Sequence, residues 1–371
     1  MPENIEKMED LSKTDQERLA QTGLEVEMKN RSGTFFQIDQ EIKHVASTEK
    51  GIEVLTLSDA LSKYDWLSGY MWKAVPHDKD KYTRYVHEQK DPKGFVIIAR
   101  KGSKTLYPLQ ACLFLANSQV QHVHNIIIAE EGAELHIISG CASATHARVG
   151  THIGVTEFYI AKNARITSTM IHNWGEKISV FPRSASIIEE NGVFLSNYVC
   201  MQPVRKIQMS PVAHLKGENS VARFNSIVVS TPGSLLDLGS VANLTAHGAS
   251  AELLTRAITT GGTIVSRGFI HGETRETKGH IECKGLILKD GIIHAIPEIR
   301  GDVVDTELSH EAAVGKIARD EIEYLMSRGL DEDVATATII RGFLDVKIAG
   351  LPEVLQNQID AAIDAAEKSG F

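Results

Sequence analysis

The chain has 371 residues, with 39 lysines and arginines against 48 acidic residues, so its net charge is −9. This balance, without a long basic run, disfavours a nucleic-acid partner bound through phosphate neutralisation. The length allows two or three domains around a sizeable core. No apolar run is long enough to span a bilayer and residues 1–19 lack an apolar signal region, so we expect a soluble, cytoplasmic protein.

Residues 1–93 are interpreted as a mixed, partly helical N-terminal domain. Ser12 is the predicted N-cap of a first helix, with Asp15 at the capping-box position. A second helix is predicted to begin at an N-cap at Ser58 and to run to about residue 75. Its apolar and aromatic side chains recur at helical spacing, which is typical of a core face; an exposed docking face is the alternative. These residues are Leu61, Tyr64, Trp66, Leu67 and Tyr70.

Residues 94–308 consist of short β-branched and apolar runs, each closed by a Gly or polar turn. The turns follow one another at steps of 31, 29, 41, 29 and 29 residues. A strand–turn–strand repeat of this size is typical of a solenoid, whose rungs bury their apolar faces only against each other. The large, irregular rungs favour a right-handed parallel β-helix, with a β-sandwich as the alternative. The predicted turn positions are Gly132, Asn163, Gly192, Gly233, Gly262 and Gly291.

Residues 309–371 regain helical periodicity and predict a small α-helical C-terminal domain. Ser309 is the predicted N-cap of its first helix and Gly329 the residue that ends it. A second helix is expected from the acidic residues 331–333, and a third after Pro352. The fold expected is therefore mainly β, a β-helix with helices at its C-terminal side. The apolar stripe of the first helix is Val314, Ile317, Ala318, Ile322, Leu325 and Met326.

Four cysteines lie far apart in the sequence, without a C-x-x-C pair, so a zinc knuckle or a disulfide framework is disfavoured. A single chain would have to combine these distant thiols, so a metal cluster here needs mixed ligands or ligands from two subunits. Residues 280–315 do combine thiol, imidazole and carboxylate groups, which suits a soft or borderline metal such as iron. The cysteines are Cys112, Cys141, Cys200 and Cys283.

The candidate ligands of this stretch each have a simpler interpretation. Cys283 lies on the apolar face of a predicted strand, which by itself favours a buried structural cysteine. The N-cap at Ser309 would place His310 and Glu311 in the first turn of a helix, where the carboxylate is ionised and available to iron. Glu311 could equally serve only the helix terminus. His294 is interpreted as a structural or supporting residue.

The segments CKGLIL, HAIPEI and LSHEA, followed by YLMSRGL and IIRGF, occur in order across about residues 95–346. In sequence and spacing they resemble the SufB/SufD family of iron–sulfur cluster assembly scaffolds. The resemblance implies a β-helix scaffold that carries a transient iron–sulfur cluster. It also implies a SufC-like ABC ATPase that docks on the C-terminal helices. The chain has no G-x-x-x-x-G-K-[ST] motif, so we expect ATP to act only through that partner and the chain not to be an enzyme.

Residue by residue, the resemblance implies that Cys283 and Glu311 are the cysteine and carboxylate where the cluster is built. It implies that His310 is the histidine contributed across a subunit interface. The segment ISGCAS aligns Cys141 with the cysteine at which sulfur is thought to enter, and IHNWGE aligns Trp174 with a tunnel-lining tryptophan. Because Cys283, His310 and Glu311 occur in one chain, a homodimer is favoured over a heterodimer with a SufB/SufD paralogue.

Several positions depart from the family pattern around the implied sulfur route. His172 replaces a glutamine, Leu113 and Leu115 replace an arginine and an asparagine, and Arg183 is the one cationic substitute for a lysine. These changes put an internal route in doubt, and direct arrival of sulfide is the alternative. Cys141 is then a core residue, as Cys112 and Cys200 are expected to be.

The implied partners are the ATPase, a second β-helix subunit, a sulfur donor and apo-acceptor proteins. One alternative function is that of a SufD-like structural partner that binds the ATPase without holding a cluster. Another is that of a β-helix carbohydrate enzyme, which the absence of a clear catalytic carboxylate pair disfavours.

Overall fold

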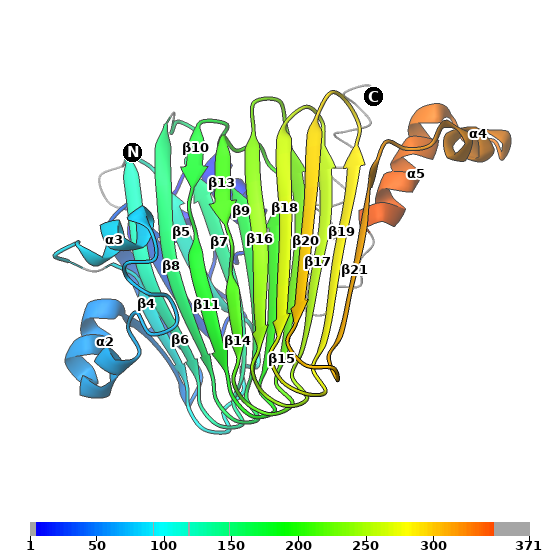
Figure 1. The fold of residues 1–371 in the computed structure, drawn as a ribbon. Helices are drawn as coiled ribbons and strands as arrows, with labels where there is room; N and C mark the ends of the chain where they lie inside the picture. Colours follow the sequence, from blue (N-terminus) through cyan, green and yellow to red (C-terminus); the bar gives the residue numbers. More distant parts are fainter. Residues whose placement is uncertain (1–4, 92, 118, 148, 345–371) are drawn as a thin grey trace.

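The computed structural model describes residues 5–91, 93–117, 119–147 and 149–344. The chain winds into a β-solenoid of about eight turns, with helices beside its C-terminal end, as Figure 1 shows. The predicted mainly-β fold with a β-helix core and a helical C-terminal part is confirmed. The helix predicted after Pro352 lies outside the described residues. None of the described helices is long and apolar enough to cross a membrane.

Two long sheets form the walls of the solenoid. Sheet A contains, in spatial order, β2 (Glu41–Ser47), β1 (Gly33–Ile38), β5 (Leu109–Leu115), β7 (Glu134–Ser143), β9 (Arg165–Asn173), β12 (Val193–Cys200), β15 (Val221–Ser230), β17 (Ser250–Thr259), β19 (Lys278–Ile287) and β21 (Glu307–Gly315). Sheet B contains β3 (Ile52–Thr56), β4 (Phe95–Ala99), β6 (Val120–Ala129), β8 (Gly150–Ile160), β10 (Ile178–Val180), β11 (Arg183–Ile188), β13 (Lys206–Met209), β14 (Val212–Leu215), β16 (Leu235–Leu244), β18 (Thr263–Gly272) and β20 (Ile292–Gly301). From β4 onward the paired strands are parallel, so each rung lies directly on the previous one.

The core lies between the two sheets, because alternate residues of each strand point inward and stack on the same position of the next rung. Phe158 of sheet B packs there against Phe194 of sheet A, and Phe194 against Phe224, with ring centroids 4.8 and 5.9 Å apart. The turns between strands require left-handed backbone, which Gly132, Asn163 and Gly233 adopt as predicted. In two other turns the left-handed residue comes one position earlier than predicted, at Asn191 and Gly261.

The N-terminal region is mixed, as expected, yet its strands continue the two sheets. Strand β1 pairs in parallel with β5 and antiparallel with β2, and β3 pairs antiparallel with β4. These antiparallel strands end both sheets at the N-terminal side of the solenoid. Ser12 caps α1 (Lys13–Ala20) as predicted, its hydroxyl accepting a hydrogen bond from the Asp15 amide. The other short helices here are η1 (Met8–Asp10), α2 (Leu57–Lys63), η2 (Asp65–Gly69) and α3 (Lys81–His87).

The long helix predicted from Ser58 to about residue 75 is wrong in extent. Thr56 rather than Ser58 caps the helix α2, which ends at Lys63 and is followed by the 3-10 helix η2 and by turns. Just before α2, residues 52–56 pair with β4 and form β3. Most of the predicted aromatic stripe does pack on the outer face of sheet B, with Leu67 fully buried. Trp66 is the exception, with 42% of its surface exposed.

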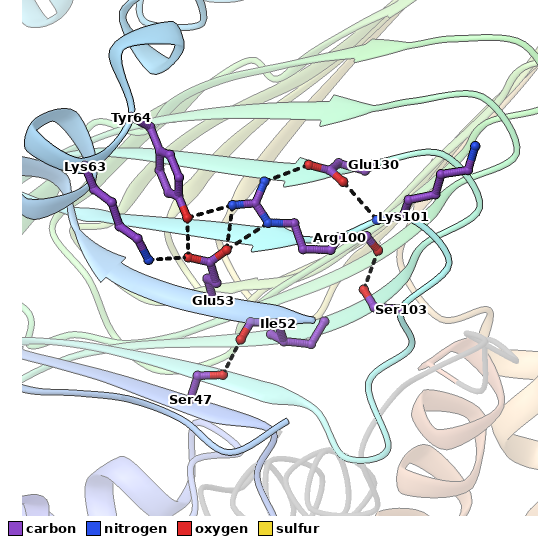
Figure 2. Close-up of polar contacts among 9 residues, drawn as sticks. All are labelled: Ser47, Ile52, Glu53, Lys63, Tyr64, Arg100, Lys101, Ser103 and Glu130. Carbon is purple, nitrogen blue, oxygen red and sulfur yellow. Dashed lines mark hydrogen bonds and ion pairs between the residues drawn. The ribbon is translucent and has the colours of Figure 1, made fainter. Parts of the chain in front are cut away.

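An ion network ties α2 to the first strands of sheet B (Figure 2). The Glu53 carboxylate accepts hydrogen bonds from Lys63 Nζ at 2.9 Å, Tyr64 Oη at 2.7 Å and Arg100 Nε at 2.8 Å. Arg100 also donates to Glu130 at 2.9 Å. Burial raises the pKa of Glu53, but these three donors outweigh it and lower the pKa to about 2.

The helix predicted to begin at Ser309 is wrong. Residues 307–315 form β21, because they pair residue for residue with β19, and this long-range pairing overrides the local N-cap signal. The helical part therefore begins after Gly315, with α4 (Arg319–Ser327) and α5 (Glu332–Leu344). Gly329 ends α4 with a φ of 96°, as predicted. Helix α5 packs through Ala337, Ile340 and Leu344 against the outer face of sheet A.

Candidate functional site

The C-terminal end of the solenoid is open in the part of the chain that the structure describes. Strands β20 and β21 are the last strands of sheets B and A, and no described strand pairs with their outer edges. Apolar side chains are exposed along this end: Ile292 is 51%, Ile299 40% and Val314 40% exposed. The helices of the N-terminal region and α5 cover other surfaces, so this end exposes strand edges and the last rung of the core (Figure 1).

Cys283 lies on the inner face of β19, one rung before this open end. It is 3% exposed, and its strand alternates as the sequence predicted, with Ile281 and Gly285 also facing inward. Burial raises the pKa of the thiol, and a hydrogen bond from Ser266 Oγ, 3.6 Å from Sγ, opposes that rise. The rung before places Thr255 in register with Cys283, and the rung after places Ala312 there.

His310 and Glu311 lie on opposite faces of β21, because successive residues of a strand alternate. His310 is in register with Ile281, on the inner side shared with Cys283, and is exposed at the open end. Glu311 is in register with Glu282 on the outer side, and its carboxylate lies 3.3 Å from Lys284 Nζ. The expected junction of thiol, imidazole and carboxylate within one chain is therefore not formed. Among the described residues, no three His, Cys, Asp or Glu side chains could together hold a metal ion.

Charged residues of neighbouring rungs surround Glu311 on the outer face. Lys284 lies between Glu311 and Glu282, with its Nζ 2.5 Å from the Glu282 carboxylate, and Arg256 also pairs with Glu282. Burial raises the pKa of Glu282, but the hydrogen bonds from Lys284 and Arg256 lower it overall. Sequence reasoning missed Arg256, Glu282 and Ser266. The repeat spacing could have found the first two, since it places Arg256 level with Lys284 and Glu282 level with Glu311 on successive rungs.

A groove opens at the last rung, beside the Cys283 position. Its volume is about 580 Å³, and we refer to it as the mouth groove. Half of its lining comes from the inner faces of the last rung, namely Ile293, Ala295, Ala312 and Val314. The other half comes from the outer face of sheet B, where His294 is in register with Val265 and Ile296 with Arg267. His294 thus belongs to the rim of the groove. The groove is lined by Val265, Arg267, Ile293, His294, Ala295, Ile296, Ala312 and Val314.

Cys141 lies far from this end, in a small chamber inside the N-terminal half of the solenoid. The chamber has a volume of about 50 Å³ and contains His152, His172 and Tyr198 in its wall. Burial raises the pKa of Cys141 to about 12 and lowers the pKa of His152 to about 3. Burial also lowers the pKa of His172, whose Nδ1 lies 2.9 Å from Tyr198 Oη. Burial thus favours the neutral forms of Cys141, His152 and His172, in a chamber whose wall mixes apolar and polar side chains.

Trp174 is fully buried, and its ring centroid lies 5.1 Å from that of His152 and 5.5 Å from that of His172. It thus packs against two residues of the chamber wall but is not itself among the residues that line the chamber. Arg183, the expected cationic substitute, points away from the lumen: its Nε lies 2.5 Å from the Asp80 carboxylate. Leu113 is in the chamber wall.

An inner-face row connects the chamber with Cys283 along sheet A. Tyr198, Ser226, Thr255 and Cys283 are in register on consecutive strands. Ser226 and Thr255 are only partly buried although both face the lumen. Large apolar side chains fill the neighbouring rows, so the lumen is a packed core in which Ser226 and Thr255 contribute hydroxyl groups to one row. Cys112 and Cys200 are fully buried in apolar clusters, in line with the core role expected for them.

These features define a parallel β-helix protein with a buried thiol one rung from an open end and helices attached just beyond it. Residues 113–343 match the family model described as SUF system FeS cluster assembly, SufBD core domain. The chain therefore belongs to the SufBD family of iron–sulfur cluster assembly proteins.

Relatives named as iron–sulfur cluster assembly SufBD family proteins cover nearly the whole chain. One from Archaeoglobus fulgidus is 46% identical over 356 residues, 95% of each chain. One from Methanothermobacter thermautotrophicus is 42% identical over 372 residues, which is 99% of this chain and 91% of the relative. A more distant one from Staphylococcus aureus is 30% identical over 342 residues, 88% of this chain and 72% of the relative. The family resemblance found in the sequence is confirmed.

Proposed function

We propose that this chain is a scaffold for de novo iron–sulfur cluster assembly that works with a SufC-type ABC ATPase. The nascent cluster is a transient cargo, held at the interface of two β-helix subunits. The observation that carries this proposal is a thiol one rung from an open, unpaired end of the solenoid. The chain lacks an ATPase motif, so ATP acts through the partner and this subunit is not itself an enzyme.

Cys283, His310 and Glu311 are the proposed ligands of the cluster. Thiolate, imidazole and carboxylate are groups that bind iron, and the thiolate is the usual ligand of iron–sulfur clusters. One chain directs Cys283 and His310 to the inner side of sheet A and Glu311 to the outer side. The two sides meet only at the free edge of β21, so a cluster that contacts all three residues has to lie at that edge. A second subunit joined there completes the site.

The free edge of β21 favours such a partner. Glu307 N–H donates to Thr277 on the β19 side, so the alternate residues, including His310 and Ala312, direct their N–H groups outward. On the free edge of β20 the row of N–H donors is interrupted, because the backbone nitrogen of Pro297 points away from β18 and carries no hydrogen. An unpaired edge with a continuous donor and acceptor row is a template for strand addition by another chain. The proposed occupant is a second copy, or a SufB/SufD paralogue.

The C-terminal helices provide the proposed docking surface for the ATPase. Helix α5 is anchored on sheet A, and the opposite surfaces of the two helices expose Tyr324 (58%), Met326 (36%) and Val334 (45%). Only three residues separate Gly315, the end of β21, from the start of α4 at Arg319. A movement of these helices driven by ATP would therefore act directly on the strand that carries His310 and Glu311.

Sulfur delivery remains a choice between two proposed routes. In the first, Cys141 accepts sulfur from a donor protein and the row of Ser226 and Thr255 leads to Cys283, with Trp174 supporting His152 and His172 in the chamber wall. In the second, sulfide reaches Cys283 through the mouth groove. A Cys141→Ser variant separates them: the first route predicts loss of assembly from a protein sulfur donor but normal assembly from free sulfide. The second predicts no loss with either source.

The test of the proposal is anaerobic reconstitution with iron and sulfide, followed by cluster absorbance and iron content. We expect Cys283→Ala and Glu311→Ala to lose the cluster, while Cys200→Ala, a matched inner-face cysteine, keeps it. Copurification with the ATPase and a mass measurement of the complex test the partners. Unchanged cluster absorbance in both ligand variants would eliminate the ligand assignment. A wild-type chain that binds the ATPase but acquires no cluster would support the SufD-like structural function instead.

A further inference from the structure

The hydroxyl group of Ser266 lies beside the sulfur of Cys283, on the opposite wall of the lumen. Ser266 is on the inner face of β18 and is 2% exposed, and its Oγ donates to Cys283 Sγ at 3.6 Å. Within the described residues, this is the one hydrogen bond found for that hydroxyl. A buried hydroxyl left without a partner costs about 1–3 kcal/mol, so the contact fixes the orientation of both side chains.

The side chains that flank this pair on the two neighbouring rungs differ in size. On the side of the core, Leu238 is in register with Ser266 and Thr255 with Cys283. On the side of the open end, the corresponding residues are Ala295 and Ala312, both of which line the mouth groove. The smallest side chains of the last rung therefore separate the sulfur from the groove. Neither Cys283 nor Ser266 lines the groove itself, so a metal ion in the groove would approach Sγ past Ala295 and Ala312 rather than past Ser266.

We propose that Ser266 is a positioning residue of the cluster-building site, holding the Cys283 sulfur one rung below the mouth groove and donating a hydrogen bond to it when iron is bound. This inference rests on the proposed function, in which Cys283 is a ligand of the cluster. Hydrogen bonds to cluster sulfurs raise the reduction potential, and partners of the ligands fix their orientation. Ser266 thus influences how tightly the scaffold holds its cargo without touching iron itself.

The experiment compares two isosteric variants, Ser266→Thr and Ser266→Val, which differ only in the hydroxyl group. Ser240→Ala is the matched control, since Ser240 is an inner-face serine on β16, 8% exposed, in the next inner-facing position beside Leu238. Each protein is reconstituted anaerobically with iron and sulfide. The measurements are the rate of iron loss to a chelator and the reduction potential of the cluster.

We expect Ser266→Val to lose iron about fivefold faster than wild type, the factor that corresponds to one net hydrogen bond. Its reduction potential should become more negative, while Ser266→Thr and Ser240→Ala match wild type. Equal behaviour of the Thr and Val variants would overturn the role of Ser266, as would an equal shift in Ser240→Ala. A Cys283→Ala protein that holds its cluster normally would instead overturn the proposed function itself, so the two failures are distinguishable.

Discussion

The buried carboxylate of Glu157 should be a main anchor of the N-terminal cover, the segment 57–90 that packs on sheet B. Glu157 is fully buried and accepts hydrogen bonds on both oxygens. Oε1 lies 2.6 Å from Trp72 N and 2.8 Å from His124 Nε2. Oε2 lies 2.6 Å from Ala74 N, and Val75 N and Tyr159 Oη complete its contacts at 3.1 and 2.9 Å. We therefore expect Glu157→Gln to loosen the cover.

The expected cost follows from these contacts. Glutamine keeps one oxygen for the donors on one side but presents N–H groups to the Trp72 amide on the other. That amide loses its acceptor, in a residue already held at a left-handed φ of 61°. The remaining hydrogen bonds become neutral ones, which are about half as strong. One lost and several weakened hydrogen bonds together amount to about 3 kcal/mol of unfolding free energy.

The pH dependence of the unfolding free energy provides a second test of the role of Glu157. Burial raises the pKa of Glu157, but hydrogen bonding to His124 and the backbone amides lowers it overall. A lowered folded-state pKa means that the carboxylate stabilises the protein above its unfolded pKa of about 4.3 and loses that contribution as the pH falls through the folded value. The difference between wild type and Glu157→Gln should therefore be constant from neutral pH down to about 5 and shrink below about 4.3.

Urea denaturation followed by tryptophan fluorescence is the assay, since the Trp72 ring lies 4.1 Å from His124, a direct neighbour of Glu157. Glu218→Gln, at an exposed turn, is the control and should change stability by less than about 0.5 kcal/mol. A Glu157→Gln protein as stable as that control would refute the reasoning. Cluster assembly at Cys283 should survive in the variant, because the cover lies at the other end of the solenoid.

Two further predictions concern the scaffold. Glu53→Gln should cost about 1 kcal/mol at neutral pH, because Glu53 is partly exposed and its ion pair with Arg100 is screened, and the cost should disappear between pH values of about 4.3 and 2, where the carboxylate of wild type is protonated. Thermal unfolding across that range measures it. Gly217→Ala should cost about 3 kcal/mol, because a Cβ there would lie 1.8 Å from the backbone nitrogen of Glu190 in the preceding rung. A Gly217→Ala melting temperature equal to that of wild type would show that the turn relaxes freely.

The sequence predicted the solenoid because its signals are local and repeated. Turn residues such as Asn163 and Gly233 are needed at every rung, and their spacing survives in the chain as a period. The strands of the N-terminal region were missed for the opposite reason. Strand β3 is only five residues long and gains its stability from pairing with β4 some forty residues later. Pairing at that distance leaves no periodic trace in the sequence.

At the candidate site, too, local sequence signals predicted the structure correctly and long-range strand pairing was missed. Alternation in the strand of Cys283 predicted its inward direction correctly, because that strand has clear neighbours on both faces. The Ser309 segment carries a helix-start pattern, yet β19 offers it nine paired positions, and pairing determined the outcome. The wrongly predicted helix changes where the two candidate ligands point. A helix would have directed His310 and Glu311 to adjacent positions around one turn, whereas the strand separates them to two sides of a sheet.

Because Cys283 and Glu311 lie on opposite faces, the position of strand β21 should control whether the proposed site can form. If the ligands met on one face of one chain, a subunit could hold its cluster without a partner, and the helices beyond Gly315 would have no reason to act on it. Because Cys283 and Glu311 face opposite sides, the proposed ligand set closes only across the edge of β21. Any change that shifts this edge strand relative to β19 alters the distance between the thiol and the carboxylate. The ion pair of Glu311 with Lys284, a residue of β19, spans that same boundary and opposes such a shift. Holding and releasing a cluster are thus expected to depend on one strand, to whose end the C-terminal helices are attached.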